Sequence, residues 1–307
     1  MNRTDDSDFK LRPPICDYEG SSYRTDFWEG QGRDYEDLAE RHALRNLLPD
    51  GGSRILDIGA GFGRLANLYA AYDHVVLLDY SVSQLQYARK RLGDTRYTYI
   101  AADLYQLPLA TNAVDVTVMV RVLHHITDVP RALSQIHHAT AGDGTFVLEF
   151  ANKRHALNII RRLLGSPMNP FDREPYAFAK LHYDYHPAWI RQRLHNSGFQ
   201  PQRERAVSTF RTAILKRLIP AATLARLDAA LQVITAPLAI APSQFVRSRV
   251  VKESASLSAD ILACPLCGHH PLHESGAEIR CPECRTRWAI DQGVYVFKHP
   301  LDGLPYA

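Results

Sequence analysis

The sequence predicts an α/β protein with a doubly wound, mostly parallel sheet, followed by a small cysteine-held module. Three observations carry this prediction. Short apolar runs alternate with helical patterns over residues 52–150, a glycine-rich turn follows the first run, and two Cys-x-x-Cys pairs lie within residues 264–284. Because parallel strands need helical crossovers, the alternation favours a parallel sheet with helices on both faces.

Bulk composition sets the class of protein. The chain has 307 residues, 46% of them hydrophobic and 22% charged, which suits one large α/β domain plus a smaller module. Apolar stretches fall short of the roughly 20 residues that span a bilayer, and the polar start MNRTDDSDFK lacks the apolar core of a signal peptide. We therefore expect a cytoplasmic protein without a membrane span.

The elements are expected in the following order. An amphipathic helix over 34–48 ends at Pro49 and Gly51. Strands are expected at 55–58, 75–78, 97–101, 114–120 and 144–150, with helices at 64–72, 81–92 and 130–140 between them. Beyond residue 150 we expect helices at 158–164 and 186–198, a strand at 200–207, two helices within 212–234 split at Pro220, and a last strand at 243–253. The small-residue stretch 254–259 reads as a linker.

The turn after the first strand has the pattern D-x-G-x-G-x-G, formed by Asp57, Gly59, Gly61 and Gly63. Glycine permits positive φ and lets a ligand approach bare backbone. The dinucleotide fingerprint G-x-G-x-x-G places its third glycine one residue later. A carboxylate beside the turn would repel a pyrophosphate and could attract a cationic ligand. The turn alone does not decide whether the ligand is a dinucleotide, a phosphate or an adenosine.

Two further acids follow neighbouring strands. Asp79 ends the second strand, 20 residues after Gly59, where a carboxylate can accept both hydroxyls of a ribose. Asp103 follows the third strand, where its carboxylate could accept a hydrogen bond from the amine of an adenine. Either acid could instead only form a turn. Three acids at carboxyl ends of strands, where open sheets bind ligands, favour an adenosine site.

Four segments in order carry a family resemblance: ILDIGAGFGRL, VVLLDYSVSQLQYARKRL, YIAADLYQLPLATNAVDVTVMVRVLHHI and AGDGTFVLEF. Residues about 35 to 150 resemble a Rossmann-like class I S-adenosylmethionine-dependent methyltransferase of the type 11 group, which includes ubiquinone and menaquinone methyltransferases. The resemblance implies S-adenosyl-L-methionine as cofactor. The implied cofactor-binding residues are Asp57, Gly59, Ala60, Gly61, Asp79, Tyr80, Asp103, Leu104, Arg121 and Tyr35. Arg121 departs from the family, which often has a smaller residue there.

Two histidines are candidate catalytic bases. His124 and His125 follow the fourth strand, and histidine can take up a proton near neutral pH. A base is needed only where the accepting atom carries a proton, so the alternative is that these rings pack on the cofactor. A second polar cluster, LHYDYHP at 181–187, either lines the acceptor pocket or leads into the next helix.

The resemblance also divides the chain. We expect an N-terminal cap or lid over 1–50, a methyltransferase domain over 51–252 with a helical insert at about 208–243, and a zinc ribbon over 259–307. Aromatic and basic side chains in the cap either exclude water from the cofactor or pack the first helix: Tyr23, Phe27, Trp28, Arg33 and Tyr35. The apolar insert at about 208–243 could shield a hydrophobic acceptor from water, mediate a dimer or form part of the core.

The C-terminal cysteines form two knuckles, Cys264-x2-Cys267 and Cys281-x2-Cys284. Four thiolates suit a closed, structural zinc site, and a module this small needs such support. His269, His270 and His273 are alternative ligands, and a redox role for each pair is a weaker alternative. The module resembles the zinc ribbon of the tRNA- and protein-methyltransferase activators. That resemblance implies a domain that stabilises the methyltransferase domain or covers its substrate side.

Charge is distributed unevenly. Residues 1–150 carry 15 Lys and Arg against 21 Asp and Glu, residues 151–252 carry 17 against 5, and residues 253–307 carry 4 against 7, giving net charges of −6, +12 and −3.

We expect methyl transfer to a small-molecule or lipid-like acceptor. The basic block supports RNA as an alternative, although no Asn-Pro-Pro-Tyr-like motif follows the fourth strand. A non-catalytic cofactor-binding regulator is the third hypothesis. The sequence does not indicate an oligomeric state.

Overall fold

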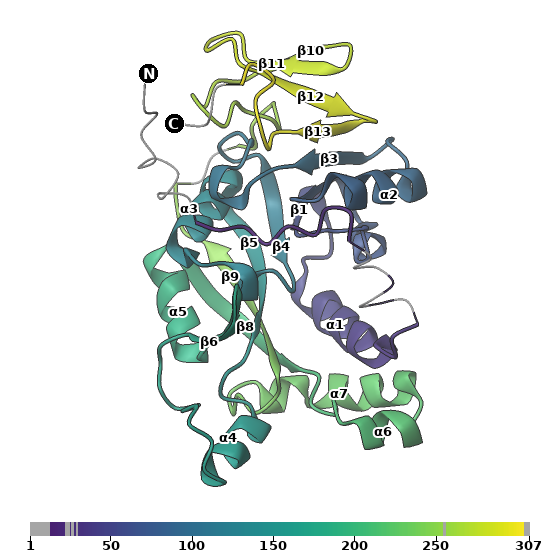
Figure 1. Ribbon diagram of the computed structural model, residues 1–307, viewed down its shortest axis with the longest axis vertical. Coiled ribbons are helices and arrows are strands. Elements are labelled where there is room, and N and C mark those ends of the chain that lie inside the picture. The colour runs from purple at the N-terminus through teal and green to yellow at the C-terminus, as the bar shows by residue number, and fades with distance from the viewer. Residues whose placement is uncertain (1–12, 22–24, 26–27, 29, 254–255, 304–307) are drawn as a thin grey trace, which may run out of the picture.

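A computed structural model describes residues 13–21, 25, 28, 30–253 and 256–303 (Figure 1). An 11-stranded sheet runs through the molecule in the order β10-β11-β12-β13-β3-β2-β1-β4-β5-β9-β8. Within the described residues, no helix is long and apolar enough to cross a bilayer.

The helices are α1 Asp34–Leu47, α2 Val82–Leu92, α3 Val129–Ala139, α4 Ala156–Leu163, α5 Pro187–Asn196, α6 Ala213–Leu218 and α7 Ala221–Thr235. The strands of the large sheet are β1 Gly52–Ile58, β2 Tyr72–Asp79, β3 Tyr97–Ala101, β4 Val114–Met119, β5 Thr140–Ala151, β8 Phe199–Val207, β9 Ser243–Val250, β10 His273–Ser275, β11 Glu278–Arg280, β12 Arg287–Asp291 and β13 Val294–Val296. A separate hairpin consists of β6 Tyr176–Ala179 and β7 His182–Asp184.

The five strands at the centre of the sheet are parallel, as the alternating pattern predicts. β1 lies between β2 and β4, with Leu56 opposite Val76 and Thr117. β8 and β9 close one end of the sheet in antiparallel pairs. The carboxyl ends of β1, β2, β3 and β4 consequently meet along one edge, which is where an open α/β sheet binds ligands.

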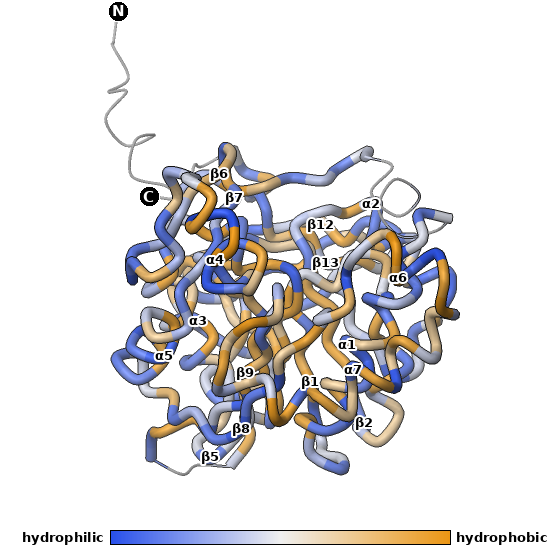
Figure 2. The backbone as a smooth tube through the Cα atoms, turned by 90° about the horizontal axis from the view of Figure 1, so that it is seen from below, coloured by the Kyte–Doolittle hydropathy of each residue, from blue (hydrophilic) through white to orange (hydrophobic). Residues whose placement is uncertain are grey.

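The sheet buries both of its faces. Side chains alternate along β2, so Val75 and Leu77 pack with α1, α2 and α7, while Val76 and Leu78 pack on the side of α3 and α5. Apolar residues accordingly gather along the strands in the middle of the molecule when it is viewed from below (Figure 2). The doubly wound architecture is confirmed.

One predicted helix is wrong. The segment 64–72 contains only a 3₁₀ turn, Ala66–Tyr69. The preceding turn keeps Gly59, Gly61 and Gly63 at positive φ, so helical geometry cannot begin before Leu65. β2 already starts at Tyr72, which leaves room for a single turn.

The cysteine module extends the large sheet. β10 to β13 form an antiparallel meander, and β13 pairs in parallel with β3, with Val294 opposite Tyr99 and Val296 opposite Ala101. The amide of Phe297 then donates to the Ala101 carbonyl at 2.8 Å. Figure 1 shows this module in yellow beside β3.

The module and the parallel sheet share one apolar core. Trp288 is fully buried and lies 5.3 Å from Phe297 between ring centres. Both belong to the same cluster of buried residues as Leu104 and Leu107, which follow β3. Neither part therefore has a separate core on this side of the sheet.

We predict that Trp288→Ala lowers the free energy of unfolding by about 3–5 kcal/mol, because it empties a site in this shared core. Urea unfolding followed by circular dichroism measures the loss, and Leu301→Ala at an exposed position of the same module is the control. A shared core also requires one cooperative transition. A separate early transition of the module that leaves the main midpoint unmoved would contradict it.

Candidate functional site

An open pocket with an empty volume of about 820 Å³, part of it open to solvent, lies at the carboxyl ends of β1 to β4. Its lining brings together predicted residues and residues from the N-terminal segment. The lining residues are Pro14, Ile15, Cys16, Tyr18, Ile58, Gly59, Gly61, Leu78, Asp79, Tyr80, Gln84, Ala102, Asp103, Leu104, Tyr105, Arg121, Val122, His125 and Ile126.

The glycine turn forms one wall of the pocket. Gly59 has a φ of +72°, and a Cβ there would lie 2.1 Å from a methyl carbon of Val122. The N–H groups of Gly59 and Ala60 both donate to the Leu78 carbonyl, at 2.8 and 3.0 Å. The turn therefore presses bare backbone against the ends of β2 and β4. Ala60 faces a smaller neighbouring cavity rather than the main pocket.

Asp79 closes the turn against β2. One carboxylate oxygen accepts from the Gly61 N–H and the other from the Ser81 N–H, each at 2.8 Å. Burial raises the pKa of Asp79, and the two backbone donors oppose that rise. Because each carboxylate oxygen has two lone pairs, both oxygens retain capacity for a ligand's hydroxyl groups.

The third acid and two flanking residues also reach the pocket. Asp103 accepts from the Tyr105 N–H at 2.8 Å and so caps the 3₁₀ turn Leu104–Gln106. Leu104 and Tyr80 line the pocket beside it. The Lys298 ammonium, just after β13, lies 3.9 Å from the centre of the Tyr80 ring. A residue of the cysteine module thus supports a side chain of the pocket.

Asp57 lies behind the glycine turn. It lines the smaller cavity of about 370 Å³ together with Trp28, and it is only 2% exposed. Burial raises the pKa of Asp57 to about 7. The Arg64 guanidinium, which lines the same cavity, opposes that rise and favours the charged carboxylate.

Arg121 belongs to both cavities. It has a φ of +60°, and its backbone N–H donates to the buried Glu149 carboxylate at 2.8 Å. Its guanidinium donates from Nε to Glu40 at 2.7 Å, and Arg64 donates to the other oxygen of Glu40 at 2.8 Å. Burial alone would raise the pKa of Glu40. The two guanidinium groups outweigh that effect and hold the pKa below its usual range. Trp28 lies over both guanidinium groups.

Tyr35 does not join the site, contrary to the cofactor-binding role expected for it. It begins α1 and is buried against the segment around α7. Its hydroxyl donates to Asp228 at 3.1 Å and accepts from the Phe210 N–H at 2.9 Å. Among the cap residues, Trp28 covers the smaller cavity, whereas Tyr23 and Phe27 lie outside the described residues.

Of the two histidines, only His125 lines the pocket. Its Nδ1 is 2.9 Å from the Leu181 carbonyl, which can only accept, so Nδ1 carries the proton. Its Nε2 then accepts from the Tyr18 hydroxyl at 3.1 Å. The ring of His124 contacts that of His125 at a tilt of 48°, with 3.9 Å between ring centres, and burial lowers the pKa of both rings. His182 of the LHYDYHP cluster lies 4.7 Å from His125 between ring centres.

The sequence predicted a cap over 1–50 but did not single out residues 14–19, which we call the strap. Its apolar and aromatic side chains line the pocket, and Glu19 anchors it by accepting from the Val82 N–H at 2.6 Å, at the start of α2. Asp17 faces Lys298 at 3.5 Å. The strap has no hydrophobic period, so no local signal marks it.

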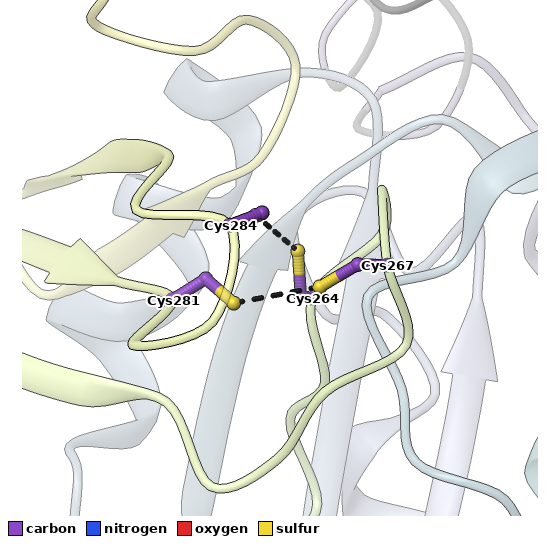
Figure 3. Close-up of side chains that lie close together, drawn as sticks. All are labelled: Cys264, Cys267, Cys281 and Cys284. Atoms are coloured by element: carbon purple, nitrogen blue, oxygen red, sulfur yellow. Dashed lines mark hydrogen bonds between the residues drawn. The ribbon is translucent and has the colours of Figure 1, made fainter.

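The four predicted metal ligands come together. Figure 3 shows the side chains of the two knuckles converging on one point. Cys264 and Cys284 are 3.5 Å apart between sulfurs, as are Cys267 and Cys281, and all four sulfurs lie within 4.8 Å of one another. Tetrahedral zinc with Zn–S bonds of about 2.3 Å needs sulfurs about 3.8 Å apart. Among the described residues the cluster contains no histidine, so His269, His270 and His273 are not part of it.

We predict one zinc ion per chain by elemental analysis, lost in the Cys281→Ser variant and retained in Cys16→Ser, whose cysteine lies outside the cluster. Removing the metal with a chelator should lower the melting temperature by at least about 5 °C, because metal binding contributes to folding free energy. Metal-free protein with an unchanged melting curve would contradict a structural zinc site.

Comparisons with known proteins agree with this geometry. Residues 56–148 match the family described as "Methyltransferase domain", and residues 258–293 match the family described as "Trm112p-like protein". A demethylmenaquinone methyltransferase of Clavibacter sepedonicus is 32% identical over 106 residues, which is 34% of this chain and 43% of that protein. Another from Chlamydia felis is 24% identical over 169 residues, covering 50% of this chain and 74% of that protein. The chain thus spans less than half of the first of these relatives.

Solved structures show the same fold. An S-adenosylmethionine-dependent methyltransferase of Mesorhizobium loti matches with a TM-score of 0.51 and 26% identity, over 69% of this chain and 97% of that one. A chain from the complex of the Haloferax volcanii Trm112 methyltransferase activator with a methyltransferase matches with a TM-score of 0.54 and 15% identity, over 75% and 96%. This chain therefore joins a methyltransferase domain and a Trm112p-like domain in one polypeptide.

Proposed function

We propose that the protein transfers a methyl group from S-adenosylmethionine to a small-molecule or lipid-like acceptor. The observation that carries this proposal is the convergence of Gly59, Gly61, Asp79 and Asp103 on one pocket. The named relatives act as demethylmenaquinone methyltransferases, which supports a methyl acceptor of that general kind.

The pocket residues suit the parts of the cofactor. Asp79 would bind the ribose hydroxyls, and Asp103 with Leu104 and Tyr80 would flank the adenine. The backbone at Gly61 would hold the methionine part, with Asp57 behind it to balance a positive charge. When bound, the cofactor supplies an electrophilic methyl group, and the protein supplies orientation and exclusion of water.

The Tyr18–His125 pair is the best-placed proton acceptor. Both rings line the pocket, and the neutral Nε2 of His125 already accepts the Tyr18 hydroxyl proton. The Tyr18 oxygen can therefore take a proton from an acceptor while passing its own to His125. His124 contacts the ring of His125, and its lowered pKa keeps it neutral. We therefore assign it to positioning His125 and not to taking up a proton.

The Trm112p-like domain would stabilise the methyltransferase domain in cis. β13 covers the edge of β3, and Lys298 contacts both Tyr80 and Asp17. These contacts join the edge of the sheet to the pocket wall and to the strap. The division into a cap at 1–50, a methyltransferase domain at 51–252 and a ribbon at 259–307 remains part of this proposal.

RNA is the second candidate substrate, favoured by the net charge of +12 over residues 151–252. RNA binding that weakens steeply with salt would support it. A cofactor-binding protein without turnover is the third reading. Transfer of label from the cofactor to an organic-phase or an RNA fraction of a cell extract separates the three.

We predict that S-adenosylhomocysteine binds and that Asp79→Ala weakens it by about 10- to 100-fold, because hydrogen bonds to a charged acceptor are lost. Isothermal calorimetry measures the affinity. Asp94→Ala, at a carboxylate that is more than half exposed, is the matched control. A thermal melt shows whether the variant is folded. Tight binding of NADH with none of S-adenosylhomocysteine would contradict the proposal.

We predict that Tyr18→Phe and His125→Gln each reduce kcat by at least about 100-fold with an acceptor that loses a proton. The affinity for S-adenosylhomocysteine should change much less, because neither group is assigned to the cofactor. His124→Gln should have a smaller effect on kcat. Equal losses of kcat and cofactor affinity in the Tyr18 variant would instead indicate that the strap only closes the cofactor site.

A further inference from the structure

Helix α4 exposes its apolar face. Leu163, at its end, and Leu164, which follows it, are 80% and 82% exposed, and Leu157 and Ile160 are about half exposed. The buried residue of the helix is the polar Asn158, whose amide donates to the Lys153 carbonyl at 3.0 Å. An amphipathic helix normally buries its apolar face. This one is anchored through its polar side and presents its apolar side outward.

A second patch of the same kind lies at the same end of the molecule. Ile214 and Leu218 of α6 are 73% and 74% exposed. The amide of Ala156, at the start of α4, donates to the Ile240 carbonyl in the segment that follows α7, which is the helix next after α6 in the chain. In Figure 1, α4 and α6 both lie at the bottom of the molecule, and in Figure 2, seen from below, both are in view. We call α4 and α6, with the residues that directly precede and follow each helix, the apolar end.

The charge of the apolar end has one sign. Residues 154–171 contain three cationic side chains and no acid, and residues 211–227 contain four and no acid. The buried Lys153, just before the first range, pairs with Asp172, just after it. Arg211 and Lys216 pair with Glu36 of α1. In the part of the chain that the structure describes, no ion pair with a carboxylate involves Arg161, Arg162 or Arg217. The exposed aliphatic groups therefore lie beside three arginines that form no ion pair with a described carboxylate: Arg161, Arg162 and Arg217.

We propose that the apolar end docks on the surface of an anionic lipid bilayer. Aliphatic side chains flanked by arginines match the boundary between acyl chains and anionic headgroups. RNA would match the cations but would leave the leucines exposed to water. A second copy of this chain would match the apolar groups but would bring like charges together.

The β6–β7 hairpin lies beside the pocket. Phe178 of β6 is 55% exposed, and its ring lies 5.7 Å from the ring of His182 on β7. His182 in turn lies 4.7 Å from His125, which lines the pocket. A lipid-like acceptor that reaches the exposed Phe178 would lie near this side of the pocket. This last step rests on the proposed function, whereas the docking itself does not.

The test is co-sedimentation of the full chain, loaded with zinc, with two kinds of vesicle: phosphatidylcholine alone, or phosphatidylcholine mixed with phosphatidylglycerol. We expect binding to the anionic vesicles that weakens with salt. Leu163→Gln with Leu164→Gln, and separately Arg161→Gln with Arg162→Gln, should each lower the partition coefficient by about tenfold or more. Val251→Gln with Leu301→Gln, at exposed aliphatic positions outside the apolar end, is the matched control and should leave it unchanged.

Several results would overturn the proposal. One is the absence of vesicle binding by a protein that still binds S-adenosylhomocysteine, which would leave the proposed function intact. Equal binding of the leucine pair variant and the control would be another. A dimer that the leucine variant dissociates, without vesicle binding, would assign the surface to a second copy. RNA binding that only the arginine variant weakens, again without vesicle binding, would assign it to nucleic acid.

Discussion

The Asp79 carboxylate accepts hydrogen bonds from the N–H groups of Gly61 and Ser81, and this pair of bonds fixes the glycine turn of β1 on the end of β2. The rest of the pocket depends on that closure. It keeps the bare backbone of Gly59 against Val122 and leaves the carboxylate at the pocket wall. The parallel order of β3, β2, β1 and β4 then brings the other predicted groups to the same edge.

Two sets of contacts support this edge from outside the central strands. On one side, α1 contributes the buried Glu40, which neutralises Arg64 and Arg121 next to the glycine turn. Removing one partner of such a buried set leaves an uncompensated charge, which costs about 3–5 kcal/mol. On the other side, the Trm112p-like domain adds β13 to β3 and places Lys298 against Tyr80. The strap is tied to both α2 and this domain, through Glu19 and Asp17.

Local patterns predicted the parts of the site that lie close together in sequence. The glycine turn, Asp79, Asp103 and the two cysteine knuckles all follow from residue type at a fixed distance from a strand or from each other. Contacts between distant segments gave no such signal. Tyr18 bonds to His125, which lies 107 residues away in the sequence. Tyr35 lies outside the site because its hydroxyl bonds to Asp228, 193 residues away. Hydrophobic periodicity also does not show which strand β13 pairs with, so its pairing with β3 could not be predicted.

The most direct test of the central claim is a crystal structure of the zinc-loaded protein with S-adenosylhomocysteine. The account predicts the ribose hydroxyls within hydrogen-bonding distance of Asp79, the adenine beside Asp103 and Leu104, and the sulfur facing the Tyr18–His125 side of the pocket. Ligand density away from the carboxyl ends of β1 to β4, or a ribose that does not contact Asp79, would contradict it.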